Sequence, residues 1–295
     1  MMTEEILLGV IGGSGLYSFE ELENQESIEI DTPFGKPSSP IVIGKIKGQK
    51  IAFLARHGIG HVYSPTDINY RANIYAFKSL GIRAIVSVSA VGSLREDYAP
   101  GHIIVPDQIY DNTKDRKRSF FGEGMVVHIS SADPFCPALS QLLLKALREQ
   151  DAIVHEGGTL ITIEGPRFST RGESETFRKW GMSLVGMTAA PEAFLAREAE
   201  MCYATMAHVT DFDCWHVSEE AVTVEMVVNT LQKNTRTAQK SIVRLVELLA
   251  EAQNAGKVRH CECEHALKDA IMTNPNAICE DKKQSLELLT GKYFK

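Results

Sequence analysis

Apolar residues in this chain form short continuous runs that alternate with longer segments of helical periodicity. Runs of this length, bounded by glycine or polar residues, are typical of buried strands. They predict strands over residues 6–11, 41–46, 50–54, 84–91, 102–105, 126–129, 159–163, 184–188 and 202–209. A Lys-Gly-Gln turn joins the second and third runs, which predicts a hairpin.

Helical periodicity separates most of these strands. It predicts helices over residues 67–80, 137–150, 173–180, 191–200 and 224–255. Leu139, Leu143 and Leu147 share one face of the second helix, as expected for a helix that packs on a sheet. The charged segment 114–124 follows neither pattern and predicts an irregular loop. Strands that alternate with helices predict an α/β protein. The length of 295 residues allows one large domain or two smaller ones.

Two carboxylates, Asp211 and Asp213, directly follow the last predicted strand. Extended backbone places side chains two residues apart on the same side, and ligands of open α/β sheets bind beyond the carboxyl ends of strands. Beside Phe212 and Trp215, at least one of these aspartates should hold its proton more tightly than a free aspartate. It could then donate that proton to a leaving group. The alternative is a polar loop whose aspartates cap a helix that starts near Ser218.

Other strand ends carry groups that suit an anion. The turn Gly12–Gly15 follows the first strand, and its N–H groups can converge on a ligand, although a plain glycine turn fits equally well. Its spacing is neither that of a dinucleotide-binding fingerprint nor that of a P-loop. Arg56 and His57 end another strand, where the guanidinium suits phosphate or, alternatively, forms a surface salt bridge. Ser89 and Ala90 end a third strand.

Composition narrows the class of partner. The net charge of −7 argues against nucleic acid, which would require a basic face, and leaves room for a small anionic ligand at a local site. The acidic N-terminal residues do not resemble a signal peptide, and no run of 18 or more apolar residues predicts a membrane span. These features predict a cytoplasmic protein without a membrane partner.

Six cysteines fall into two groups. Three of them, Cys136, Cys202 and Cys214, lie among apolar residues and are predicted to be core. The other three, Cys261, Cys263 and Cys279, lie in a polar tail. Free thiols are the first expectation for the tail, and a Cys261–Cys263 or a Cys136–Cys202 disulfide is an alternative in a thermophile. Structural zinc held by His260, Cys261, Cys263 and His265 is a further alternative, although Cys-x-Cys differs from the usual ligand spacing.

Taken together, these groups resemble the trimeric purine nucleoside phosphorylase superfamily and, within it, the methylthioadenosine phosphorylase branch. The matching motifs are IGGSGL (11–16), DTPFGKPS (31–38), ARHG (55–58), AVGSLRE (90–96), TIEGPRFSTR (162–171), AAPEAFLAREA (189–199) and TDFDCW (210–215). They appear in order over residues 6–250, and TIEGPRFSTR and TDFDCW are the specific ones. The resemblance implies a single α/β domain with a central, mixed and distorted sheet flanked by helices.

The reaction that the resemblance implies is phosphorolysis, in which inorganic phosphate attacks C1′ of a nucleoside and the purine leaves. Asp213 would protonate or hydrogen-bond N7 of the base, and Asp211 would help to hold the base and its 6-amino group. A carboxylate can accept from an amine, so Asp213 favours adenine over hypoxanthine, and methylthioadenosine is the implied substrate. The alternatives are a methylthioinosine or general purine nucleoside phosphorylase, against which Asp213 and Val224 argue, and a nucleoside-binding sensor. A sensor would be expected to lose the phosphate-binding set or the acid, and this chain keeps both.

The same resemblance implies the remaining binding residues. Phosphate would contact Ser14, Arg56, His57, Ser89, Ala90 and Thr188. The nucleoside would contact Met187, Phe168 and Ser169, with Val224 and Val227 at its 5′ end and His128 arriving from a neighbouring subunit. A lone histidine such as His128 is otherwise more often structural. The resemblance implies no metal and no cofactor. Inorganic phosphate is a co-substrate of the implied reaction.

Because the family's site lies at a subunit interface, the resemblance implies a homotrimer or a dimer of trimers. It also implies a phosphorylase domain over residues 1–256 and a C-terminal extension, 257–295, on the same domain or on a neighbouring subunit. The chain departs from the family pattern in two ways. Ser14 and Ser89 stand where animal members tend to have threonine, which keeps the hydroxyl, and the tail is longer and richer in cysteine.

Overall fold

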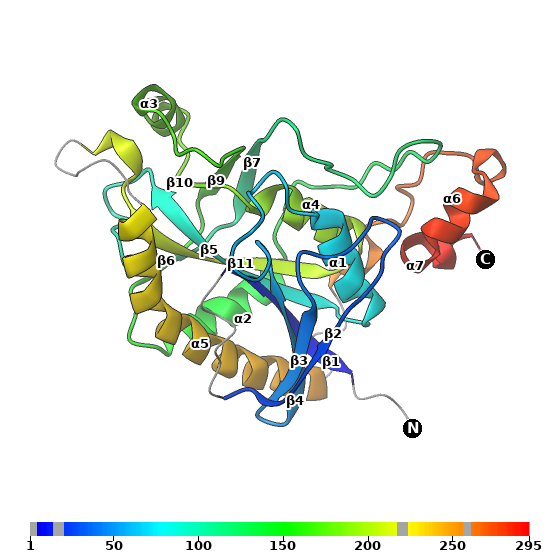
Figure 1. Cartoon of the computed structure of the whole chain (residues 1–295), viewed down its shortest axis with the longest axis horizontal. Coiled ribbons are helices and arrows are strands. Elements are labelled where there is room, and N and C mark those ends of the chain that lie inside the picture. The colour runs from blue at the N-terminus through cyan, green and yellow to red at the C-terminus, as the bar shows by residue number, and fades with distance from the viewer. Residues whose placement is uncertain (1–4, 14–20, 217–223, 256–260, 295) are drawn as a thin grey trace.

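A mixed sheet of eleven strands runs through the centre of the molecule (Figure 1). The computed structural model describes residues 5–13, 21–216, 224–255 and 261–294, without the side chains of residues 226–233. Within that part of the chain, the strands are β1 (Ile6–Gly12), β2 (Glu23–Ile28), β3 (Ile41–Ile46), β4 (Gln49–Ala55), β5 (Ala84–Ser93), β6 (Ile103–Val105), β7 (Gln108–Asn112), β8 (Val154–Glu156), β9 (Thr159–Ile163), β10 (Leu184–Gly186) and β11 (Cys202–Asp211).

Strand β5 is the branch point of this sheet. The main path is β2-β3-β4-β1-β5-β10-β9-β7, while β11 pairs with β5 and leads to β6 and β8. One edge of β5 pairs with β1 through residues 85–87 and with β10 only at Gly92 and Ser93. Residues 88–91 lie between those two registers, so their backbone groups on that edge must find other partners. The sheet is therefore distorted where a ligand could approach.

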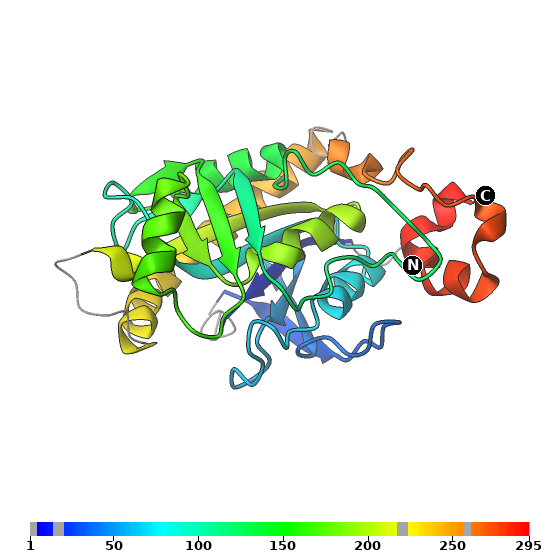
Figure 2. The ribbon, with the colours of Figure 1, turned by 90° about the horizontal axis from the view of Figure 1, so that it is seen from above.

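Helices cover both faces of the sheet (Figures 1 and 2). The described helices are α1 (Tyr70–Ser79), α2 (Pro137–Arg148), α3 (Arg171–Lys179), α4 (Ala189–Glu198), α5 (Val224–Asn254), α6 (Glu280–Ser285) and α7 (Glu287–Thr290). Strand alternation explains the two layers. On β11, Ala204 and Met206 pack in the core that α2 and α5 cover, whereas Tyr203 packs in the core that α1 and α4 cover.

The C-terminal tail folds back on the core of its own chain. Ile278, Leu286 and Leu289 are buried in the same cluster as α1 and α4, and Figure 1 shows α6 and α7 beside that end of the molecule. The predicted domain boundary falls in residues 256–260, outside the described residues, so the division into a domain and an extension stays a prediction.

The predicted α/β architecture is confirmed, with errors in polar segments. The strand predicted over 126–129 is wrong. Val126 and His128 are exposed there, and only Val127 forms an isolated bridge, to Ile271 of the tail. The apolar residues of that segment favour a strand, but in the described structure the segment pairs with the rest of the chain at one tail residue, which is too little to form a strand. Conversely, β2, β7 and β8 were missed because they are short or polar. No helix in the described part of the chain is long and apolar enough to cross a membrane.

Candidate active site

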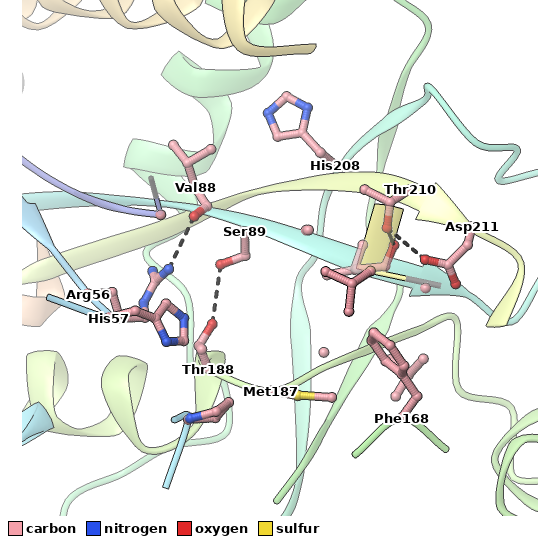
Figure 3. Close-up of a pocket in the computed structure, with 18 of the residues that line it drawn as sticks. Arg56, His57, Val88, Ser89, Phe168, Met187, Thr188, His208, Thr210 and Asp211 are labelled. Atoms are coloured by element: carbon pink, nitrogen blue, oxygen red, sulfur yellow. Dashed lines mark hydrogen bonds between the residues drawn. The ribbon is translucent and has the colours of Figure 1, made fainter. Parts of the chain in front are cut away.

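A cavity of about 370 Å³ opens beside residues 88–91 of β5 (Figure 3). Its walls come from the carboxyl ends of β4, β5, β9, β10 and β11 and from α5, so segments distant in sequence meet here. The predicted site residues that line it are Arg56, His57, Ser89, Ala90, Phe168, Ser169, Met187, Thr188, Asp211, Asp213 and Val224. The structure thus brings these side chains together, while the role of each stays a prediction.

Three predicted site residues are not part of the described wall. Ser14 and the side chain of Val227 lie outside the described residues. His128 is described and exposed, and its backbone N–H donates to the Ala270 carbonyl at 2.9 Å. It does not line this cavity, so within one chain it has no contact with the site.

Arg56 closes one end of the cavity, with 2% of its side chain exposed. Its Nε and Nη2 donate to the two carboxylate oxygens of Glu192 at 2.8 and 2.9 Å. Nη1 donates to the Val88 carbonyl at 3.2 Å, and Nη2 also donates to Ser87 Oγ at 2.6 Å. Burial lowers the pKa of Arg56, but the Glu192 carboxylate outweighs it, so the net shift is upward and the guanidinium stays charged. Glu192 therefore takes one edge of the guanidinium fork, and a direct contact between Arg56 and phosphate stays a prediction.

Two hydroxyls and an imidazole supply the other polar groups at this end. Ser89 Oγ and Thr188 Oγ1 lie 3.3 Å apart (Figure 3). His57 Nδ1 lies 2.9 Å from the Tyr63 carbonyl, which can only accept, so Nδ1 carries the proton. Burial and then the charge of Arg56 lower the pKa of His57 to about 4. The ring is therefore neutral at pH 7, and its Nε2 is an acceptor.

Asp211 lies at the opposite end of the cavity (Figure 3). Thr210 Oγ1 donates to Asp211 Oδ2 at 2.7 Å, and the backbone N–H of Asp213 donates to Asp211 Oδ1 at 2.8 Å. Gly92 makes this placement possible, because a Cβ at that position would lie 2.9 Å from Asp211 Oδ1. Both oxygens of Asp211 thus have protein partners, and its carboxyl group is held in one orientation.

Asp213 differs from Asp211 in that its carboxyl group is held less firmly. It begins the 3₁₀ turn η1 (Asp213–Trp215) and adopts a left-handed backbone conformation, with φ of 52°. Such strain in a residue other than glycine is concentrated at functional sites. Its Oδ2 is buried and makes no hydrogen bond of good geometry among the described residues, although the Ser174 and Ser169 hydroxyls lie near enough to the carboxyl group to lower its pKa. Burial raises the pKa of Asp213, as it does for Asp211, in the direction expected from the sequence. The helix-cap alternative concerns residues near Ser218, which lie outside the described part of the chain.

The wall between the two ends is largely apolar. Met187 and Phe168 contribute to it, and Val224 adds an apolar group from the first residue of α5 (Figure 3 shows Met187 and Phe168). Apolar walls with a few fixed polar groups are typical of small-molecule sites. The arrangement can therefore hold an amphiphilic molecule, with hydroxyl and imidazole groups at one end and carboxyl groups of raised pKa at the other.

Arg116 is a supporting residue that the sequence did not reveal. It lies in the predicted irregular loop 114–124, yet its side chain is 1% exposed. Its Nη1 donates to the carbonyls of Met187 at 2.6 Å and Ala190 at 2.8 Å, and its Nε pairs with Glu164 Oε1 at 3.1 Å. Arg116 thereby fixes the chain on both sides of Thr188. A charged loop gives no sequence signal for such burial.

His208 and Asn234 also line the cavity, and both were missed. Among the described residues, the two ring nitrogens of His208 have no hydrogen-bond partner. The same is true of Asn234 Nδ2. Burial lowers the pKa of His208 to about 4, so the ring is neutral. His208 stands in an apolar run, and Asn234 in a long helix. From sequence alone, both residues would be interpreted as structural. Only the register of the neighbouring strands shows that they face the cavity.

Comparisons with known proteins agree with this geometry. The model of the phosphorylase superfamily matches residues 7–247. The chain is 51% identical to an S-methyl-5′-thioadenosine phosphorylase of Chloroflexus aurantiacus, over 97% of this chain and 98% of that protein. It is 49% identical to a protein of that name from Geobacter sulfurreducens, over 98% and 99%.

Solved structures give the same result. A methylthioadenosine phosphorylase from an antarctic soil metagenomic library is 45% identical, covers 97% of this chain and 99% of its own, and has a TM-score of 0.91. The Schistosoma mansoni methylthioadenosine phosphorylase, solved with adenine, is 35% identical, covers 92% and 99%, and has a TM-score of 0.85. The sequence motifs, the branched sheet and these relatives agree: the chain belongs to the phosphorylase superfamily.

Proposed function

We propose that this protein catalyses the phosphorolysis of S-methyl-5′-thioadenosine to adenine and 5-methylthioribose-1-phosphate. The carrying observation is one cavity with hydroxyl and imidazole groups at one end and, at the other, a buried carboxyl group whose pKa is raised. A nucleoside that lies between them would meet phosphate on the sugar side and an acid on the base side. The names of the full-length relatives support this substrate.

At the phosphate end, Ser89 and Thr188 donate hydroxyl hydrogen bonds, and Nε2 of neutral His57 accepts the proton of a hydrogen phosphate dianion. Ser14, which follows β1 in the sequence and lies outside the described residues, is proposed to add a further hydroxyl, and Ala90 its backbone. Arg56 clamps the Val88 carbonyl and so sets the position of Ser89 on the free edge of β5. A bound dianion beneath the sugar would stabilise the positive charge of an oxocarbenium-like transition state.

At the base end, Asp213 transfers or shares its proton with purine N7 as the C1′–N9 bond breaks. Its raised pKa favours the acid form, and its buried Oδ2 lines the end of the cavity where the base would lie. Asp211 holds the turn that presents Asp213 and helps to position the 6-amino group. Ser169 borders this end, and its hydroxyl lies near enough to the Asp213 carboxyl group to lower the pKa of Asp213.

The sugar is proposed to lie against Met187 and Phe168, with its 5′-methylthio group toward Val224 and Val227. Val224 has no hydrogen-bonding side chain, so it offers nothing to a 5′-hydroxyl. Methylthioadenosine should therefore exceed adenosine in kcat/KM by roughly 10- to 200-fold, the range for apolar discrimination. Adenosine and methylthioadenosine used equally well would identify a general nucleoside phosphorylase instead.

A substrate panel tests this proposal. Base release from methylthioadenosine, adenosine, methylthioinosine and inosine would be measured at saturating phosphate, without added metal or cofactor. We expect adenine-type substrates to be preferred and no requirement for an additive, because no cofactor forms part of the proposed reaction. A preference for the 6-oxopurines would contradict the assignment of Asp213 and Asp211.

We further propose that the active form is a homotrimer or a dimer of trimers, with His128 completing a neighbour's site. His128 is exposed and does not line its own chain's cavity, which leaves it available to another subunit. Light scattering should give a trimer or hexamer, and a fully active monomer would contradict this proposal. A cytoplasmic location and the division at residue 256 remain predictions, the first testable by cell fractionation and the second by truncation.

A further inference from the structure

Four cysteines meet at the start of β11, whereas the cavity lies at the other end of that strand. Cys136 is the N-cap of α2, Cys202 opens β11, and Cys261 and Cys263 lie at the start of the 3₁₀ turn η2 (Glu262–His265) in the tail. Their sulfur atoms all lie within 4.8 Å of one another. Residues far apart in sequence thus place four soft ligand atoms in one small volume.

This group bears on two expectations about the tail. The sulfurs next to Cys261 and Cys263 are those of Cys136 and Cys202, and His265 is described and is not in the group. His260 lies outside the described residues, so the alternative ligand set with histidines is not described in full. The thiols are free, as expected, but Cys263 is 2% exposed and Cys261 only partly exposed, so they are not solvated.

The backbone fixes the two core cysteines independently of the tail. The N–H of Cys136 donates to the Tyr203 carbonyl at 2.8 Å, and the N–H of Cys202 donates to the Arg83 carbonyl at 2.8 Å. One half of the sulfur cluster therefore belongs to the α2–β11 packing of the sheet. The tail brings the other half to it.

The spacing of the sulfurs fits a tetrahedral metal better than a pair of disulfides. Zinc–sulfur bonds of about 2.3 Å place the sulfurs of a tetrahedron about 3.8 Å apart. Here the Sγ atoms of Cys136 and Cys261 lie 3.3 Å apart, and every other pair lies within 4.8 Å. A disulfide needs sulfurs about 2.0 Å apart and divides four cysteines into two pairs. All four are free thiols in this structure.

Hydrogen bonds around the cluster favour thiolates, the form that binds metal. The backbone N–H of Cys263 donates to Cys261 Sγ at 3.5 Å, and Arg197 Nη1 donates to Cys263 Sγ at 3.5 Å. The Arg197 guanidinium would offset part of the negative charge that four thiolates leave on a divalent ion.

We propose that Cys136, Cys202, Cys261 and Cys263 bind one zinc ion, which fastens the C-terminal tail to the sheet. Four thiols lose their protons to solvent, and four zinc–sulfur bonds form. Four protein ligands leave no open position, so the site is structural and takes no part in the reaction of the cavity. Because Ile278, Leu286 and Leu289 lie further along the same tail, the ion also anchors the segment that buries them.

Metal analysis of the full-length protein, purified under reducing conditions with added Zn²⁺ and then desalted, tests the site. We expect about one zinc ion per chain, the stoichiometry of a tetrathiolate site. Replacement by Co²⁺ should give the sulfur-to-cobalt charge-transfer bands and the strong visible absorption of a tetrahedral thiolate complex. This measurement uses the wild-type chain, so it does not depend on the folding of a variant.

Variants locate the ion. Cys263→Ser should lose the zinc and lower the melting temperature, whereas Cys279→Ser, which alters an exposed tail thiol outside the cluster, should keep both. A chelator should lower the melting temperature of the wild type and of Cys279→Ser alike. Zinc retained in a folded Cys263→Ser variant would place the ion elsewhere and overturn the proposal.

Two other results would also overturn it. One is a wild-type chain that binds neither Zn²⁺ nor Co²⁺ after full reduction. The other is peptide mapping, without reductant, that finds Cys136–Cys202 and Cys261–Cys263 disulfides in protein taken directly from cells with thiols blocked. Neither result would affect phosphorolysis in the cavity, so the failure of this proposal is distinguishable from failure of the proposed function.

Discussion

The two ends of the cavity are built in opposite ways. At one end, both sides of the Arg56 guanidinium are already engaged, by Glu192 and by groups of β5. At the other, the Asp213 carboxyl group is buried beside the Ser174 and Ser169 hydroxyls, with no opposite charge paired with it among the described residues, and its pKa is raised. The Arg56 charge is therefore used to hold the protein's structure, whereas the Asp213 carboxyl group can act on a ligand.

This difference separates positioning from chemistry. Removal of either member of a buried charge pair leaves the other charge uncompensated, so the pair holds its surroundings strongly in place. A buried acid that has no opposite charge beside it contributes less to the geometry, but it can move a proton. Substitutions at the Arg56 end should therefore act mainly on stability and phosphate binding, and substitutions at the Asp213 end mainly on turnover.

The largest effect is expected at Asp213. Asp213→Asn preserves size but removes the transferable proton, so kcat on methylthioadenosine should fall by about 10²–10⁴. The KM for phosphate should hardly change, because that site lies on the other side of the sugar. Steady-state kinetics with both substrates varied would measure the two effects separately.

Two further measurements control this prediction. Thermal melting must show that the variant is folded, because Asp213 also begins η1. Because its pKa is raised, Asp213 keeps its proton to a higher pH than a free aspartate does. Wild-type kcat should decline as pH rises through that pKa, and Asp213→Asn should lack this decline. A folded variant that keeps kcat within about threefold would show that Asp213 is not a general acid.

Glu192→Gln tests the positioning end. It leaves the buried Arg56 charge without its carboxylate, and breaking such a pair costs roughly 3–5 kcal/mol of unfolding free energy. Urea denaturation would measure this loss. The matched control is Asp97→Asn, which breaks the Arg95–Asp97 pair at 2.7 Å, where the side chains are 44% and 59% exposed. That exposed pair should be worth less than about 1 kcal/mol. Equal losses in the two variants would refute the contrast.

Val224→His should narrow the preference for methylthioadenosine over adenosine, because an imidazole can bond the 5′-hydroxyl. The wild-type ratio is expected to be roughly 10- to 200-fold. The ratio of kcat/KM values is the measurement, and an unchanged ratio would place the 5′ group away from Val224. His128→Ala cannot replace Val224→His in this test. His128 is proposed to contact a neighbour's site, so its loss could act through subunit assembly.

The smallest effect concerns His57. With a folded pKa of about 4, lowered from 6.5, the ring should remain neutral between pH 5 and 8 in the phosphate-free protein. The unfolded chain takes up this proton first as pH falls, so His57 lowers the stability of the fold between about pH 6.5 and 4. NMR titration of its ring protons should show no midpoint near 6.5, and such a midpoint would mean that Nε2 is not a buried acceptor.

Sequence patterns predicted the buried strands of the sheet and most helices, because buried strands and amphipathic helices carry period and length signals. The motif resemblance added residues such as Thr188 and Phe168, which no periodicity could select. The partners of these residues escaped prediction. Glu192, Arg116 and His208 act through burial and register between distant strands, and neither is encoded in the local pattern. The same holds for Cys136 and Cys202, which meet Cys261 and Cys263 only in the fold.

The stoichiometry of the reaction tests the central claim most directly. Methylthioadenosine would be incubated with a limiting amount of inorganic phosphate, and adenine and sugar phosphate would be quantified together. The two-ended cavity predicts one adenine and one 5-methylthioribose-1-phosphate for each phosphate consumed, and essentially no adenine when phosphate is left out. Adenine released at the same rate without phosphate, or no adenine released at all, would contradict the proposed function.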